Sequence, residues 1–210
     1  MTLLRVRVEV ADRPGALAGL TTALAALSVD VASIDVLEVD GSTVVDELVL
    51  RLPHDVTARD VWDVLRVAGA AEVLSSAAEG PSTDPAVSAI ELVRSVLTDP
   101  GDADAPGRAL ARAAYADVGM WIESDAAARY PLAERALTTG VPATGAAGPD
   151  ASPLALPSGR VLWVAPQVDA PHRLAVVGRR TGIRFSATEA ARLSAFATLL
   201  DTLDRVRTEH

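Results

Sequence analysis

Six consecutive residues near the start of the chain, Asp12-Arg13-Pro14-Gly15-Ala16-Leu17, carry groups that could hold a small polar ligand. An alternating strand pattern ends just before them, and a helical pattern begins among them, with Pro14 suited to the first helical turn. Asp12 is placed to cap the exposed amides of that turn, and Gly15 leaves the backbone bare beside them. Because free N–H groups at a helix N-terminus attract anions, we predict a ligand-binding site at this turn.

The other polar side chains lack the spacing of a catalytic or metal site. The chain has no Cys and no Lys, which excludes disulfides, thiolate chemistry and Schiff bases. Its histidines have no second ligand at metal-binding spacing, its clustered aspartates lack the glycine and closing Glu of a calcium loop, and its serines lack a nucleophile elbow. We expect surface or loop roles for all of them, and no enzyme activity, metal or cofactor. They are His54, His172, His210, Asp99, Asp102, Asp104, Ser75, Ser76 and Ser158.

Two further sets of side chains lie in the second half of the chain. Trp121 and Trp163 fall on predicted strands, where they could stack on a planar ligand or fill the core. Core packing is favoured, since only 3% of the residues are aromatic. Four arginines could gather around an anion if their strands pair, or could form a solvated edge, and the sequence does not decide between the two. They are Arg160, Arg173, Arg179 and Arg180.

Composition predicts a compact, acidic protein of two units. The 210 residues are 50% hydrophobic, all 19 basic residues are Arg, and the net charge is −9. This charge, with Arg dispersed along the chain, argues against a nucleic-acid partner, and the skewed composition is typical of a GC-rich bacterial gene. The first residues lack the apolar stretch of a signal peptide, and every apolar run is too short to span a membrane. We therefore expect no membrane association and a cytoplasmic location.

The elements that must position the turn follow a β-α-β-β-α-β order over residues 1–78. An alternating strand leads into the turn, and leucines at helical spacing follow it. Two β-branched runs around Asp40-Gly41 predict an antiparallel hairpin. The spacing of Thr57 and Asp60 predicts a capped helix, and a short strand begins at Glu72. This is the ferredoxin-like arrangement.

With this order, residues 3–77 resemble an ACT domain, a small regulatory module that binds amino acids. Two marks carry the resemblance: the Asp12–Leu17 stretch, and Asp30 between apolar residues as the chain enters the second predicted strand of the unit, which is the first strand of the hairpin. The resemblance implies a homodimer with ligand at its interface. The amides of Gly15, Ala16 and Leu17 would hold a carboxylate, and Asp12 and Asp30 would face an amino group or side chain. The implied ligand-binding residues are Asp12, Arg13, Gly15, Ala16, Leu17, Asp30 and Val31.

Residues 79–84 are small and proline-rich and predict a linker, after which residues 85–210 form a second unit. We expect two helices, with Val87, Ile90, Val93 and Leu97 of the first facing inward, then a strand at 119–122 and a short helix ending at Gly140. A loop over 141–153, an antiparallel pair of strands and a long helix capped at Ser186 would follow. This arrangement, with the Phe185-Ser186-x-x-Glu189 motif, is similar to a reduced GAF domain. The predicted fold class is thus α+β, a ferredoxin-like ACT-type domain followed by a GAF-like domain with an antiparallel sheet and flanking helices.

These features predict a non-enzymatic regulatory protein that senses a small molecule, with an amino acid as the expected ligand. It would act as a homodimer and pass its signal to an unidentified protein partner. The alternative is a structural dimerisation or scaffold protein, because a Pro-Gly turn with a capping Asp also occurs in ordinary strand-to-helix connections. A filled, solvent-free turn would favour this alternative.

Overall fold

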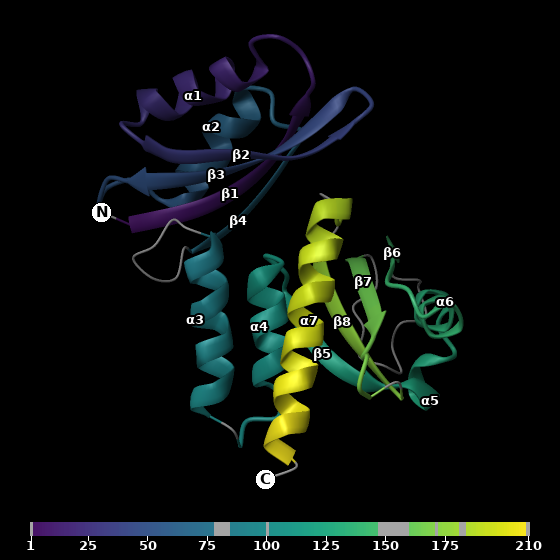
Figure 1. Ribbon diagram of the computed structural model, residues 1–210. Coiled ribbons are helices and arrows are strands. Elements are labelled where there is room, and N and C mark those ends of the chain that lie inside the picture. The colour runs from purple at the N-terminus through teal and green to yellow at the C-terminus, as the bar shows by residue number, and fades with distance from the viewer. Residues whose placement is uncertain are drawn as a thin grey trace. The chain divides into compact units, whose positions relative to one another are not determined.

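The computed structural model describes residues 2–77, 85–99, 101–146, 160–170, 172–180 and 184–208. The chain divides into two compact units, Met1–Ser88 and Ala89–His210 (Figure 1). The predicted linker at 79–84 lies outside the described residues, and its boundaries stay a prediction. Each unit contains one antiparallel four-stranded sheet with helices, so the fold class is α+β.

The first unit has the predicted β-α-β-β-α-β order. Its sheet order is β2-β3-β1-β4, in which all neighbouring strands are antiparallel. The Asp40-Gly41 hairpin is confirmed, with Gly41 at φ 61°, and two irregularities in β2 lie between Val31 and Ser33 and between Val36 and Glu38. The elements are β1 (Thr2–Ala11), α1 (Ala16–Ala26), β2 (Asp30–Asp40), β3 (Thr43–Leu52), α2 (Ala58–Val67) and β4 (Glu72–Ala77).

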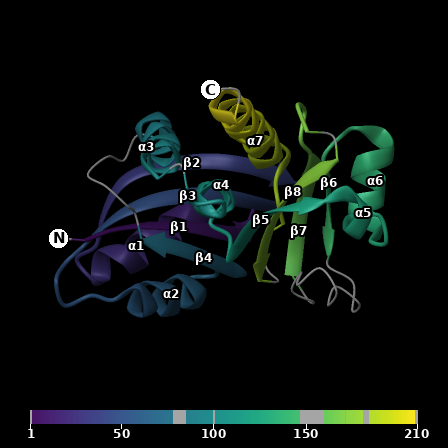
Figure 2. The ribbon, with the colours of Figure 1, turned by 90° about the horizontal axis from the view of Figure 1, so that it is seen from below.

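Alternation along the strands and helical spacing create one core between this sheet and its helices. Both helices lie on the same face of the sheet (Figures 1 and 2). Even-numbered residues of β1 and β3 face them, and the predicted capping box of α2, Thr57 with Asp60, is present. Burial of these aliphatic side chains is the main stabilising contribution to the unit. The most deeply buried members are Val6, Val8, Leu20, Leu24, Leu48, Leu50, Val61 and Leu65.

The remaining elements form a second antiparallel sheet, with strand order β5-β8-β7-β6. The predicted pairing of residues 160–166 with 173–180 is confirmed. Gly140, at φ 66°, ends α6 as expected. The elements are α3 (Pro85–Thr98), α4 (Ala105–Ala113), β5 (Val118–Glu123), α5 (Ser124–Ala127), α6 (Pro131–Thr139), β6 (Ala143–Ala146), β7 (Arg160–Pro166), β8 (Arg173–Arg180) and α7 (Ala187–Thr208).

Helices cover both faces of this second sheet. On one face, Trp163 of β7 and Val177 of β8 belong to a core shared with α3, α4 and α7. Leu110 of α4 and Leu193 of α7 belong to the same core. The alternate residues of the same strands face α6, on the other side of the sheet (Figure 1). Trp163 is fully buried, in agreement with the core role predicted for it. No helix in the described part of the chain combines the length and apolar character needed to cross a bilayer.

Two predictions for the second unit were wrong. Val87, Ile90 and Leu97 are exposed instead of facing inward, and α3 packs through Val96 and the partly buried Leu92. The segment predicted as loop contains β6, which pairs with β7 over Ala143–Ala146. Small residues of low strand propensity form β6 because the adjacent strand offers a ladder of hydrogen bonds, a tertiary effect that local composition does not report.

Candidate functional site

The predicted turn joins β1 to α1 and is open to solvent. Asp12, Arg13, Pro14 and Gly15 are exposed, while Ala16 and Leu17 are half-buried and pack on the core. Gly15 is the N-cap of α1, at φ 87°, a left-handed conformation that favours glycine. A Cβ at this position would meet nothing within 4 Å, so a side chain here would strain the backbone without clashing.

The structure corrects the predicted cap. Asp12 makes no side-chain bond to the start of α1, and Pro14 precedes the helix instead of lying in its first turn. The backbone N–H of Asp12 donates to the carbonyl of Ser42 at 2.8 Å, which fixes the turn to the β2–β3 hairpin. A glycine N-cap has no side chain to satisfy the first amides, so α1 begins with its N-terminus uncapped.

Two of the three predicted anion-binding amides remain available. The N–H of Ala16 donates to the carbonyl of Arg13 at 3.1 Å. Within the described residues, the N–H groups of Gly15 and Leu17 have no acceptor. A ligand carboxylate would satisfy these amides and would benefit from the positive end of the helix dipole.

Asp30 and Val31 lie at the start of β2. Asp30 Oδ2 accepts a hydrogen bond from Arg51 Nη1 at 2.7 Å, and both side chains are largely exposed. Val31 is half-buried and packs on the core. An exposed ion pair of this kind contributes little to stability, so Asp30 and Arg51 remain free to exchange partners with a ligand.

Within one copy of the chain, the two parts of the predicted site lie at opposite ends of the sheet. Ala11, which precedes the turn, pairs with Thr43 at one end of β3. Asp30 pairs with Arg51 near the other end. The eight residue steps from Thr43 to Arg51 correspond to about 27 Å, too far for one amino acid to bridge. The structure therefore brings Asp12–Leu17 together but does not add Asp30 and Val31.

Sequence reasoning missed a buried carboxylate on β3. Asp46 is 3% exposed, and its Oδ1 has no hydrogen-bond partner within the described residues. Burial raises the pKa of the Asp46 carboxyl, and repulsion from Asp12 raises it further. The sequence carried a signal for this burial. Asp46, Leu48 and Leu50 are alternate residues of one strand, so Asp46 lies on the face of the sheet that the helices cover.

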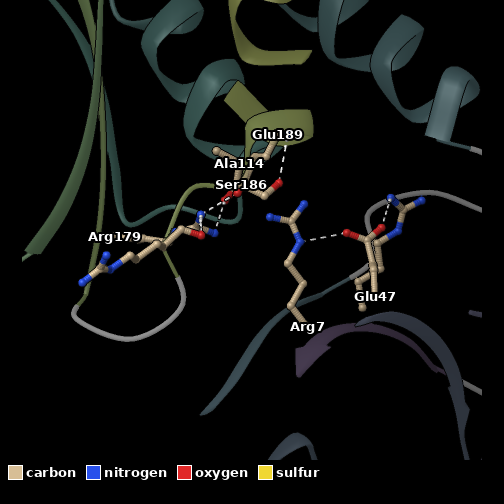
Figure 3. Close-up of polar contacts among 8 residues, drawn as sticks. Arg7, Glu47, Ala114, Arg179, Ser186 and Glu189 are labelled. Carbon is tan, nitrogen blue, oxygen red and sulfur yellow. Dashed lines mark hydrogen bonds and ion pairs between the residues drawn. The ribbon is translucent and has the colours of Figure 1, made fainter. Parts of the chain in front are cut away.

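The charged side chains on the other face of β1 and β3, away from the helices, form ion pairs. Arg7 and Glu47 are register partners, and Arg7 Nε donates to Glu47 Oε2 at 2.9 Å (Figure 3). Arg5 Nη1 lies 3.9 Å from Glu47 Oε1. A buried carboxylate held by two guanidinium groups is already compensated, so Glu47 is a structural residue.

Among the four arginines considered for an anion site, the three with described side chains do not converge, because each has a different carboxylate partner. The side chain of Arg180 is outside the described part. Arg160 pairs with Asp117 at 3.2 Å, and Arg173 pairs with Glu123 at 3.1 Å. Arg179, which is fully buried, bonds Glu189 Oε2 at 2.6 Å (Figure 3).

The remaining polar candidates form no metal cluster among the described residues. Asp102 is bound by Arg108, and this hydrogen bond lowers the pKa of the Asp102 carboxyl. The imidazole of His172 lies 3.9 Å from Glu123. The structure does not describe the side chains of Ser75 and Ser76. Ser158 and His210 lie wholly outside the described residues.

Comparisons with known proteins give only weak likenesses in structure. No family of known sequences matches the chain, and no curated protein does. The C-terminal domain of the MgtC protein from Mycobacterium tuberculosis has a TM-score of 0.33 at 12% identity, over 40% of this chain and 95% of that one. A formyltetrahydrofolate deformylase from Pseudomonas putida KT2440 has 0.34 at 11% identity, over 45% and 38%. An unknown protein from Galdieria sulphuraria has 0.34 at 14% identity, over 95% and 92%. At these TM-scores the likenesses carry no argument, and membership of a family stays a proposal.

Proposed function

We propose that the chain is a non-enzymatic regulatory protein that binds an amino acid and acts as a homodimer, with an ACT-like unit followed by a GAF-like unit. One observation supports this most directly. The residues expected to bind the ligand are separated in one copy, and pairing through the edge strand β2 would bring them close. A second copy is therefore part of the proposed site.

The edge strand β2 has the length and surface for such pairing. It is 11 residues long and lies at the end of the sheet order. Ile34, Val36 and Val39 on it are exposed hydrophobic residues. A long, apolar edge strand is a template for adding another strand, and a two-fold symmetric pair of such strands runs antiparallel.

Antiparallel pairing of β2 with its copy would place Asp30 of the partner subunit at the end of the sheet that holds the Asp12 turn. The path from β1 through β3 and β2 to the added strand is three strand spacings, or about 14 Å. Side chains from both sides and an amino acid between them could span this width. The amides of Gly15 and Leu17 would hold the carboxylate, and the partner's Asp30 would close the site from the opposite side.

The experiment combines ligand binding with subunit complementation. Isothermal titration calorimetry against the proteinogenic amino acids should identify a ligand, and Gly15→Val and Asp30→Ala should each abolish its binding. A refolded mixture of the two variants should recover binding, because a mixed dimer contains one site with an intact turn and an intact Asp30. A site contained in one copy would not be restored by mixing.

Three results would contradict the proposal. A monomer in sedimentation velocity removes the shared site, and the absence of binding in the mixture places both residues in one copy. A stable dimer that binds none of the amino acids would instead identify a scaffold protein.

Gly15→Val must be shown to fold by circular dichroism, because valine at a positive φ costs roughly 1–2 kcal/mol.

A further inference from the structure

Helix α3 buries little of its apolar surface. Among its described side chains only Val96 is buried, and Leu92 is partly buried beside it. A helix of 14 residues is marginal by itself in water, because helices in proteins are stabilised mainly by packing of an apolar face. Three large aliphatic side chains of α3 are nevertheless between 41% and 65% exposed. They are Val87, Ile90 and Leu97.

The exposed aliphatic residues lie on one stripe of the helix, on the side away from Val96. With Arg94 they are three, four and three residues apart, which is the a/d spacing of a coiled-coil seam. Arg94 Nε and Nη2 donate to Glu91 Oε2 at 2.8 and 2.7 Å. The aliphatic part of Arg94 thus continues the stripe, while Glu91 neutralises its charge. The members of this α3 stripe are Val87, Ile90, Arg94 and Leu97.

The α3 stripe is complementary to itself when two copies run antiparallel. A two-fold axis at Leu92 sets Val87 against Leu97 of the partner subunit, and Ile90 against Arg94 of the partner subunit. Each a position then faces a d position along the whole stripe. Glu91 lies next to the residue that faces Arg94 of the partner subunit, so the ion pair that now lies within one helix has a second partner across the axis.

Charge favours a second copy of the chain over other occupants of this face. The net charge of −9 makes two copies repel each other over most of their surface. Helix α3 contains one Glu and one Arg, so its net charge is zero where the copies would meet. A lipid surface suits the helix less well, because amphipathic helices that bind membranes carry many Lys and Arg residues on the polar face.

We infer that α3 is a dimerisation surface at which two copies of the chain pair antiparallel through the α3 stripe. The inference depends neither on a bound amino acid nor on pairing through β2, because it uses a different surface. A chain with two self-pairing surfaces closes into a dimer when one two-fold axis serves both, and otherwise forms a tetramer or a longer assembly. The test therefore follows the α3 contact itself as well as the mass.

Cysteine cross-linking of the full chain tests the contact and its direction. The wild type has no Cys, so introduced thiols are the only ones. Val87→Cys/Leu97→Cys should form a covalent dimer on mild oxidation, seen by non-reducing electrophoresis, because each thiol faces its counterpart in the partner subunit. Neither single variant should do so. Antiparallel pairing separates the two equivalent thiols by about 15 Å along the helix, whereas a disulfide needs Cα atoms within about 7 Å.

Sedimentation equilibrium measures the contribution of the stripe to self-association. Ile90→Arg should raise the dissociation constant at least about a hundredfold, because the dimer loses two isoleucine contacts, each worth about tenfold or more. Ser95→Arg is the matched control. It adds the same charge at an exposed position of α3 outside the stripe, and it should associate like the wild type. Both variants should keep the wild-type melting temperature, because Ile90 and Ser95 are exposed in one copy.

The outcomes separate this inference from the proposed function. A covalent dimer of either single cysteine variant would show parallel pairing and overturn the antiparallel register. No cross-link in the double variant, or equal association of Ile90→Arg and Ser95→Arg, would remove α3 from the interface. Val36→Arg on β2 provides the comparison. If it alone dissociates the protein, pairing through β2 stands and the α3 inference fails. If Ile90→Arg alone does so, the α3 inference stands and the ligand site shared through β2 fails.

Discussion

Replacing Arg179 with alanine is expected to destabilise the second unit by about 3–5 kcal/mol, because it leaves Glu189 buried without its main partner. Arg179 is fully buried on β8. Its Nη2 donates to Glu189 Oε2 at 2.6 Å and to the carbonyl of Arg184 at 3.1 Å. Its guanidinium also lies 4.0 Å from the centre of the Phe185 ring. One side chain therefore ties β8 to the start of α7.

Urea unfolding followed by circular dichroism measures this loss, which is a large part of the 5–15 kcal/mol typical of a domain. Arg173→Ala is the matched control, since Arg173 is on the same strand but its ion pair with Glu123 is exposed. It should cost less than about 1 kcal/mol. The double variant Arg179→Met/Glu189→Leu should recover much of the loss, because apolar residues of similar volume leave no buried charge. A loss below 1 kcal/mol for Arg179→Ala would show that Glu189 has adequate partners without it.

The sequence predicted the first unit well because its signals are local. Alternation in β1, the Asp40-Gly41 turn and the Thr57–Asp60 capping box each specify a short segment. Together they allow few arrangements of four strands and two helices. The exposed face of α3 shows the limit of this reasoning. Val87, Ile90 and Leu97 have helical spacing, yet spacing alone does not say whether a neighbouring element covers them.

The candidate site was predictable only in part, because its geometry depends on strand register. The motif marked Asp12 and Asp30, but their distance follows from which residues of β3 each strand pairs with. Asp46 was detectable in principle, since it is a charged residue at a core-facing position of an alternating strand. The burial that raises its pKa depends on how the helices pack on the sheet, which no local pattern encodes.

Replacing Gly119 with alanine is expected to destabilise the second unit by about 3 kcal/mol, at the upper end of the cost of overpacking. A Cβ on Gly119 would lie closer than 3.0 Å to the carbonyl oxygen of Gly107 and to the amide nitrogen of Ala111. A Cβ on Gly107 would in turn meet the backbone of Gly119. The two glycines thus let α4 pack on β5 at backbone contact. Since backbone atoms cannot move aside as a side chain can, the helix must shift from the sheet.

Urea unfolding of Gly119→Ala, Gly119→Val and Gly101→Ala checks this packing. Gly101 is the matched control in the same unit, because the nearest heavy atom to its added Cβ is Asp99 Oδ1, at 3.8 Å. Gly101→Ala should change stability by less than about 0.5 kcal/mol, whereas Gly119→Val should fail to fold. If Gly119→Ala matched the control, α4 would have room to move away from β5. The close backbone contact between Gly107 and Gly119 would then not be needed for the second unit to fold.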